Sequence, residues 1–146
     1  MRKLLALAVV ALALPAMTLA GGQSMSPVVS AKLKGSNERP VKGDSDGKGL
    51  VIVHFNANKG TTCWDFKGVT GIGKPTAAHI HKGKKGTSGA VVVAFGATYK
   101  ASGCAKTPKA TIEKMETNPN AYYVNIHNAK YPAGALRGQL VAGMEG

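Results

Sequence analysis

Hydrophobic and polar residues alternate in short runs from about residue 31 onwards, and Gly, Pro and Asn separate the runs. Alternation with a period of two is typical of a strand that buries one face. The pattern predicts strands at residues 31–35, 49–56, 61–69, 78–81, 89–95, 121–127 and 135–141. Short strands at this spacing, with turns between them, predict an all-β fold, an antiparallel sandwich or barrel in one domain.

Three segments lack the strand pattern. Residues 36–46 are polar and contain Pro40, which indicates a loop. Residues 98–109 look irregular. Residues 109–117 favour a short helical turn, which Pro119 ends.

Polar side chains share one face on three of the predicted strands. Residues i and i+2 of a strand point to the same side of a sheet, opposite the hydrophobic residues of that strand. The polar faces carry the pairs His79/His81, Asn125/His127 and Arg137/Gln139. A hairpin-length connection joins the second and third strands, so at least these two are expected to be neighbours.

The histidines on this face predict a metal site. Neutral imidazole is a common ligand of copper and zinc, and three imidazoles with an open position suit copper or a catalytic zinc. The predicted ligands are His79, His81 and His127. The alternative is a set of exposed or hydrogen-bonded histidines on the solvent face. His54 is a weaker candidate, because it shares its face with Ile52 and is better explained as a core or edge histidine.

Arg137 is the candidate catalytic residue of this face. A guanidinium stays charged at any working pH and can guide a small anion towards a metal. An equally good interpretation is a surface charge, or an anchor that donates to loop carbonyls near Pro132 and Gly134.

The first thirty residues predict export. Met1-Arg2-Lys3 is basic, residues 4–14 are apolar but too short to span a bilayer, and small residues end at Ala20. We therefore expect a signal peptide at residues 1–20, a flexible lead at 21–30, and a periplasmic or secreted chain without a membrane span after cleavage.

The charge of the chain indicates an anionic partner. The chain contains 19 Lys and Arg and 7 Asp and Glu, which gives a formal charge of +12. Loss of Arg2 and Lys3 with the signal peptide lowers this charge to about +10. Such a field attracts a small anion, an acidic surface or an acidic polymer. Nucleic acid is not expected, because aromatic residues are 5% of the chain and no nucleic-acid-binding motif is present. Hydrolase motifs are also absent from the sequence.

Cys63 and Cys104 are the two cysteines of the chain. In an exported protein a disulfide between them is expected, because the compartment is oxidising. A thiolate metal ligand is the competing interpretation, and the histidines make it unnecessary.

Four blocks of sequence resemble the CHRD domain, which was named from chordin and is common in exported bacterial proteins. The blocks are Ala77-Ala78-His79-Ile80-His81-Lys82-Gly83, Gly89-Ala90-Val91-Val92, Tyr122-Tyr123-Val124-Asn125-Ile126-His127 and Pro132-Ala133-Gly134-Ala135-Leu136-Arg137-Gly138-Gln139-Leu140. Glu38-Arg39-Pro40 looks like the family's Glu-x-Pro, whereas Ala135 stands where an acidic residue is frequent. The resemblance covers residues 31–142 and implies a β-sandwich.

A more distant resemblance is to the copper half of Cu,Zn superoxide dismutases. It rests on His79-Ile80-His81 after a turn, on His127 in a later strand and on the C-terminal Gly-x-x-Arg. It implies an antiparallel Greek-key β-sandwich in which these histidines bind copper and Arg137 steers superoxide. The segment between His81 and Gly89 is too short for a zinc loop, so the resemblance implies a copper-only site.

Two functions follow as hypotheses. The first is an exported copper-binding CHRD domain with superoxide dismutase-like activity at a three-histidine site. The second is a non-catalytic binding module, which stores or transfers copper in the envelope or recognises a protein or glycan. The pattern of residues leaves the oligomeric state open.

Overall fold

The computed structural model describes residues 27–144 of the chain, so the predicted signal peptide at residues 1–20 lies outside the described residues. The elements in chain order are β1 (Val28–Lys34), η1 (Gly35–Asn37), β2 (Lys48–Asn56), β3 (Thr61–Thr70), β4 (Pro75–Lys82), β5 (Val91–Ala94), β6 (Ser102–Lys106), α1 (Lys109–Thr117), η2 (Pro119–Ala121), β7 (Tyr122–Asn128), β8 (Leu136–Gln139) and β9 (Val141–Ala142).

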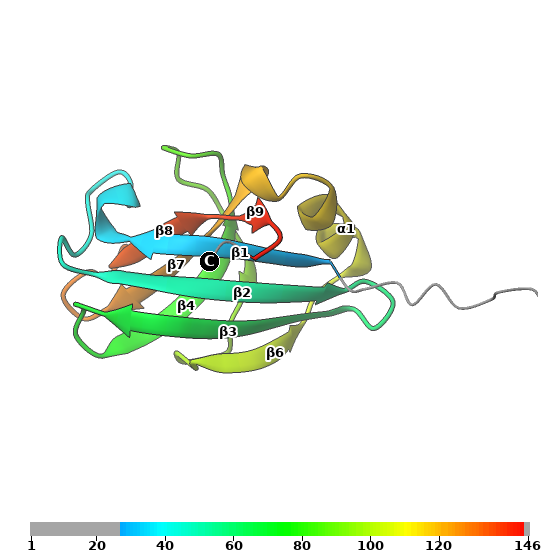
Figure 1. The fold of residues 1–146 in the computed structure, drawn as a ribbon, viewed down its shortest axis with the longest axis horizontal. Coiled ribbons are helices and arrows are strands. Elements are labelled where there is room, and N and C mark those ends of the chain that lie inside the picture. The colour runs from blue at the N-terminus through cyan, green and yellow to red at the C-terminus, as the bar shows by residue number, and fades with distance from the viewer. Residues whose placement is uncertain (1–26, 145–146) are drawn as a thin grey trace, which may run out of the picture.

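The strands form one antiparallel sheet that curls over a single core. Its order is β5-β4-β7-β8-β1-β2-β3-β6, and β9 pairs with β1. Figure 1 shows β2 and β3 in front of β4 and β7, so the two halves of the sheet make the two layers of a sandwich. The all-β, antiparallel prediction is confirmed.

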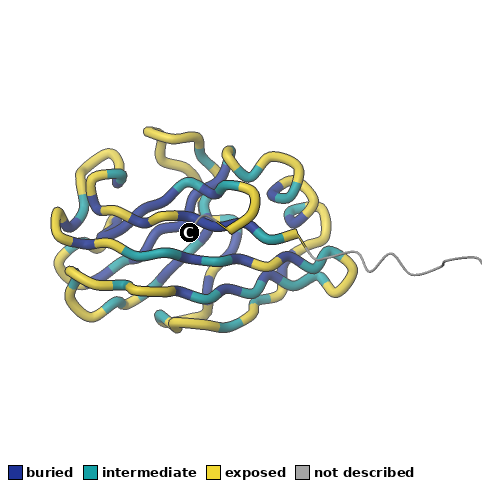
Figure 2. Tube along the Cα trace, viewed as in Figure 1, coloured by how far each residue is buried: buried dark blue, intermediate teal, exposed yellow. Residues whose placement is uncertain are grey.

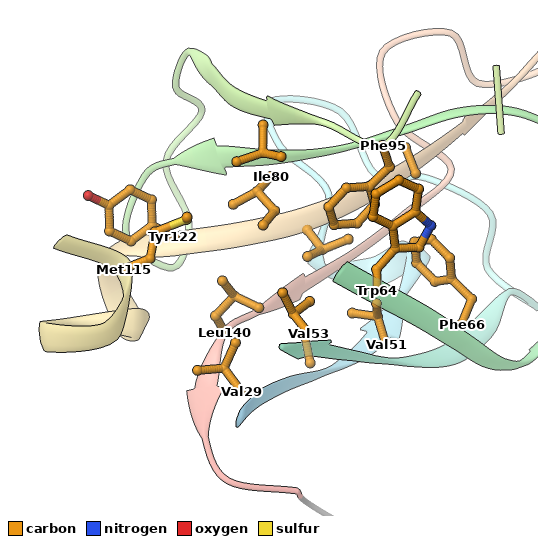
Figure 3. Close-up of a cluster of buried hydrophobic side chains, with 14 of the residues drawn as sticks. Val29, Val51, Val53, Trp64, Phe66, Ile80, Phe95, Met115, Tyr122 and Leu140 are labelled. Atoms are coloured by element: carbon orange, nitrogen blue, oxygen red, sulfur yellow. The ribbon is translucent and has the colours of Figure 1, made fainter. Parts of the chain in front are cut away.

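The alternation of the sequence accounts for the core. In β2, Val51, Val53 and Phe55 are fully buried, whereas His54 between them is exposed. Side chains from both layers meet in the same way, as Figure 3 shows for Val53, Ile80 and their neighbours. Exposed residues gather mainly in the loops at the ends of the strands (Figure 2). Burial of alternate residues is the main force that fixes each strand's orientation.

Aromatic side chains fill the space between the two end strands of the sheet. β5 and β6 end the strand order, and Phe95 directly follows β5. Its ring stacks on Trp64 of β3, with centroids 4.4 Å apart, and meets the edge of Phe66 at 5.8 Å. Among the described residues β5 and β6 do not pair with each other, so these aromatic contacts join the two layers there. Trp64 and Phe66 are both buried in the core.

The predicted helical turn is α1, and its bounds agree with the prediction. Ile112 and Met115 are fully buried on one side of the helix. Met115 lies beside Tyr122 at one end of the core (Figure 3). The helix therefore covers this end of the core with two apolar side chains.

Two boundaries differ from the prediction. Residues 98–109 are not wholly irregular, because β6 forms there and pairs with β3. β1 starts at Val28, so the predicted flexible lead at residues 21–30 is too long at its C-terminal end. In both cases pairing with a neighbouring strand supplies order that the local hydrophobic pattern does not show.

The predicted disulfide joins Cys63 and Cys104. The two residues are direct partners in the register of β3 and β6, with their Cα atoms 4.0 Å apart. Disulfides persist in oxidising compartments, so the bond agrees with an extracellular or exported protein. Across residues 27–144 the chain has no helix with the length and hydrophobicity needed to cross a membrane.

Candidate metal centre

The site lies on the outer face of β4, β7 and β8, opposite the core. The register aligns two rows of side chains across these strands. One row is His79–Asn125–Arg137 and the other is His81–Tyr123–Gln139. The predicted adjacency of β7 and β8 is therefore confirmed, and the structure adds β4 as the third neighbour on the same polar face.

The three predicted histidines meet on this face. Their candidate ligand atoms all lie within 4.8 Å of one another, and each side chain is half-buried. His79 Nδ1 is 3.0 Å from His127 Nε2. Two nitrogens bound to one ion at about 2 Å each are roughly 3 Å apart at tetrahedral or square-planar angles. The cluster can hold a metal ion with little rearrangement.

Backbone carbonyls orient two of the imidazoles. His81 Nδ1 donates to Gly89 O at 2.9 Å, and His127 Nδ1 donates to Pro132 O at 2.9 Å. A neutral imidazole carries one proton, so the Nε2 atoms of both rings are left as lone pairs. His81 Nε2 is buried and makes no hydrogen bond of good geometry among residues 27–144, although the Asn125 side chain is close enough to influence the pKa of the ring. An orphaned lone pair that faces two further imidazoles fits a metal ligand.

The carbonyl that orients His81 is placed by a tightly closed loop between β4 and β5. Lys82 N donates to Ala90 O at 2.9 Å and closes the loop. A Cβ at Gly89 would lie 1.6 Å from Lys82 O, so a larger residue would open the loop at its neck. Glycine at this position therefore permits the close approach that sets the imidazole of His81.

Burial keeps two of the imidazoles neutral. Desolvation, together with the neighbouring His127 and His81, lowers the pKa of His79 to about 4. Desolvation also lowers the pKa of His81, against the opposing effect of its hydrogen bond to Gly89. Metals bind the neutral ring, so these two side chains are ready to bind at neutral pH without losing a proton to solvent.

Asn125 and Tyr123 complete the immediate surroundings of the histidines. The buried Asn125 side chain lies 3.0 Å from His127 Nε2. The Tyr123 ring is stacked on His81 with centroids 4.9 Å apart and planes 5° from parallel. Alternation places both residues on the polar face, but nothing in the sequence alone indicates that they contact the histidines.

Arg137 is buried beside this cluster rather than exposed. It is 2% accessible, its Nη2 donates to Lys84 O at 3.1 Å, and its guanidinium lies 3.4 Å from the centre of the Tyr123 ring. The alternative of a surface charge is wrong, because Arg137 is buried. Arg137 does donate to a loop carbonyl, as the anchor alternative expected, but that carbonyl belongs to Lys84 in the β4–β5 loop and not to residues near Pro132 and Gly134. Since β7 lies between β4 and β8, Tyr123 separates Arg137 from His81.

A buried carboxyl group, Glu38, lies near Arg137. Desolvation raises the pKa of Glu38 to about 7, although the positive charge of Arg137 opposes the rise. The carboxylate occupies the space that a side chain at position 134 would need, 2.3 Å from an ideal Cβ of Gly134. Gly134 also has φ +147, so glycine is required there on both grounds.

His54 lies outside the cluster. It is exposed on β2 and is paired with Val28 and Cys63, whereas the three-histidine group is on β4 and β7. It is therefore not a ligand of this centre, and it is not a core residue either. The local pattern misassigned its environment because Ile52, on the same face, is only partly buried.

The fold and site together describe an all-β domain with a three-histidine group on the outer face of its sheet. The family model of the CHRD domain matches residues 29–140, and the chain belongs to this family. Searches of curated proteins and of solved structures found no match.

Proposed function

We propose that the protein is an exported copper-binding CHRD protein that dismutes superoxide at the three-histidine centre. The observation that carries the proposal is the convergence of His79, His81 and His127 within 4.8 Å on an outer, partly exposed face. The centre has no fourth His, Cys, Asp or Glu ligand among the described residues, so one position stays open to a small molecule.

The donor set supports copper over zinc. Three neutral imidazoles provide nitrogen only, and both cysteines are held in the disulfide, so thiolate cannot contribute. Among first-row divalent metals, copper binds nitrogen sites most tightly, and imidazole suits both of its redox states. A structural zinc site is normally enclosed by four protein ligands, which this centre does not offer. A catalytic zinc uses the same three-histidine set, so the preference for copper rests on its higher affinity for nitrogen ligands.

Copper would supply the redox chemistry of the reaction. Held by His79, His81 and His127, it would cycle between Cu(II) and Cu(I), so that one superoxide would be oxidised to O₂ and a second, with two protons, reduced to H₂O₂. The chain's own residues keep the imidazoles neutral and oriented, through burial and through the carbonyls of Gly89 and Pro132.

The surrounding charge favours arrival of an anion. The chain has a formal charge of +12, and Arg137 lies one aromatic ring away from His81. In this proposal Arg137 attracts superoxide through its field and positions Tyr123 against His81, without touching any of the three histidines.

The decisive experiment loads the purified protein with copper and measures metal content, copper affinity and superoxide consumption in three forms. We expect one copper per chain in the wild type. His81→Ala should weaken copper binding by more than about 100-fold and abolish activity, because removal of a ligand costs at least as much as loss of an outer hydrogen bond to one.

His54→Ala is the matched control, since it removes a histidine from a strand outside the cluster. It should leave copper content and activity unchanged. Equal copper binding by wild type and His81→Ala would overturn the metal site. Stoichiometric copper without turnover would overturn the catalytic step and leave copper storage or transfer as the function.

A further inference from the structure

A pocket of about 210 Å³ opens beside the metal centre, and Arg137 lines it. In the strand order the pocket lies over β8 and β1, whereas Tyr123 and the histidines lie on β7 and β4. β1 and β8, which lie next to each other, provide its base (Figure 1), and η1 with the following residues and the β4–β5 loop provide its sides. Its lining residues are Lys32, Asn37, Arg39, Lys85, Gly86, Arg137 and Gln139.

The pocket is strongly cationic. Four of the lining residues are Lys or Arg and none is acidic. Within the part of the chain that the structure describes, none of these four cations makes an ion pair, because the two salt bridges there join Lys67 to Asp65 and Lys109 to Glu113. Cations brought together without an anion repel one another, so an anion at their centre would be stabilised.

Arg137 gives a second indication of an anion. Its Nη1 is buried and lacks a hydrogen-bond partner among residues 27–144, although Nη2 of the same group donates to Lys84 O. A buried guanidinium donor without an acceptor is unusual, and it marks a position where an oxygen of a ligand would be favourable.

The nearby acid does not fill this role. Glu38 lies close enough to Arg137 for their charges to interact, but the two form no ion pair within 4 Å and Glu38 does not line the pocket. Its burial also favours the neutral carboxyl, so it only partly balances the four cations.

We propose that this pocket binds a dianionic tetrahedral oxyanion of the phosphate or sulfate class. Arg137 holds it at the base, and Lys32, Arg39 and Lys85 contact it from three separate segments. A tetrahedral oxyanion has oxygens pointing in several directions, so it suits positive groups on several sides. The planar guanidinium can donate hydrogen bonds to two of these oxygens at once. The proposal goes beyond the proposed copper chemistry, because it needs neither metal nor turnover.

The anion can be a free ion or a group on a chain molecule. A second groove, lined by Lys32, Lys34, Lys48 and Lys67 among others, continues from the pocket across β1, β2 and β3 and shares Lys32 with it. A polymer with repeated phosphates could occupy both, whereas a free ion would occupy the pocket alone.

The test titrates metal-free protein with inorganic phosphate by calorimetry and by amide NMR shifts. Saturable binding of one phosphate per chain is expected, with shifts centred on the pocket. Lys32→Gln and Lys85→Gln should each weaken binding about fivefold or more, because each removes a charge adjacent to the ion. Both residues are exposed, so the variants should fold.

Lys59→Gln is the matched control. Lys59 is exposed in the β2–β3 turn and lines neither the pocket nor the second groove. It should change phosphate affinity less than about twofold, as expected for a screened surface charge. Equal effects of Lys32→Gln and Lys59→Gln, or shifts spread over the whole surface, would overturn the site in favour of general charge attraction.

A parallel titration with long-chain polyphosphate distinguishes the two sources. Tighter binding of the chain, with sensitivity to both Lys85→Gln and Lys34→Gln, supports a polymer-borne group in the pocket. Equal affinity per site, with sensitivity to Lys85→Gln alone, supports the free ion. Binding of either ligand that is insensitive to Lys85→Gln overturns the proposal. Because copper is absent, failure here leaves the proposed copper activity untouched.

Discussion

Glu38 and Arg137 are ionisable side chains, each 2% accessible, that lie near each other, and Arg137 lies beside the metal centre. The Arg137 guanidinium donates a hydrogen bond to Lys84 O and lies against the Tyr123 ring. Oε1 of Glu38, in contrast, is buried without a hydrogen-bond partner among the described residues. This asymmetry explains why burial raises the pKa of Glu38 to about 7 despite the nearby positive charge.

Substitution of Glu38 by Gln is therefore expected to alter the pH dependence of stability. The pKa of Glu38 rises from 4.5 to about 7 on folding, so its contribution to stability is fully present below pH 4.5 and is lost as pH rises through 7. The glutamine of Glu38→Gln cannot ionise. Relative to wild type, the free energy of unfolding of this variant should therefore rise by about 3 kcal/mol between pH 4.5 and pH 7.

Urea unfolding of wild type and Glu38→Gln across this pH range measures the effect. Glu113→Gln, on the exposed side of α1, controls for loss of a surface carboxylate. A constant difference in unfolding free energy between wild type and Glu38→Gln at all pH values would show that Glu38 ionises as freely in the folded chain as in the unfolded one.

Among the strands, β6 shows what local pattern leaves out. Its residues are exposed or half-buried in alternation, and it contains no large apolar side chain. Its order comes from pairing with β3 and from the disulfide, which are contacts between distant parts of the chain. Hydrophobic periodicity predicts strands that bury a face in the core, so it misses a strand held by its edge.

Removal of the disulfide should therefore destabilise the fold but spare the metal centre. Cys63→Ser/Cys104→Ser opens a loop with a sequence separation of 41, for which the chain-entropy relation gives a loss of about 4 kcal/mol. The cysteines are on β3 and β6, whereas the histidines are on β4 and β7. Chemical unfolding and metal affinity of the double variant test the two parts separately. A large loss of affinity in a variant that remains folded would contradict their independence.

In the candidate site too, the local sequence pattern predicts some features, whereas others depend on contacts between distant parts of the chain. Alternation alone places His79, His81 and His127 on polar strand faces, because each flanks buried residues such as Ile80 and Ile126. Their meeting depends on the register of β4 with β7, strands far apart in the chain. The stacking of Tyr123 on His81, the carbonyl of Gly89 and the burial of Arg137 depend on loop closure, which no local pattern specifies.

In the whole molecule, the residues of the core and the residues of the candidate sites lie on opposite faces of the curled sheet. The core lies between the layers, whereas the histidines and the cationic pocket lie on the outer face, beneath loops. Substitutions of exposed residues on the outer face, such as Lys32 and Lys85, therefore change charge with little effect on packing. The +12 formal charge is carried mainly by exposed lysines, which makes long-range attraction of anions a property of the entire chain.

If superoxide is the substrate, its rate of consumption by the copper-loaded protein should fall with ionic strength. Salt shortens the screening length from about 30 Å at 0.01 M to about 3 Å at 1 M, so attraction from distant lysines is lost first. Pulse radiolysis across this range measures the rate constant.

Lys85→Glu, in the β4–β5 loop beside Arg137, should lower the rate at low salt and flatten its salt dependence. Lys59→Glu, in the β2–β3 turn, makes the same change in net charge at a position outside the pocket and should have a smaller effect. Equal effects would mean that net charge, rather than the arrangement of cations around Arg137, determines the approach of the anion. A rate that does not change with salt would exclude electrostatic attraction altogether.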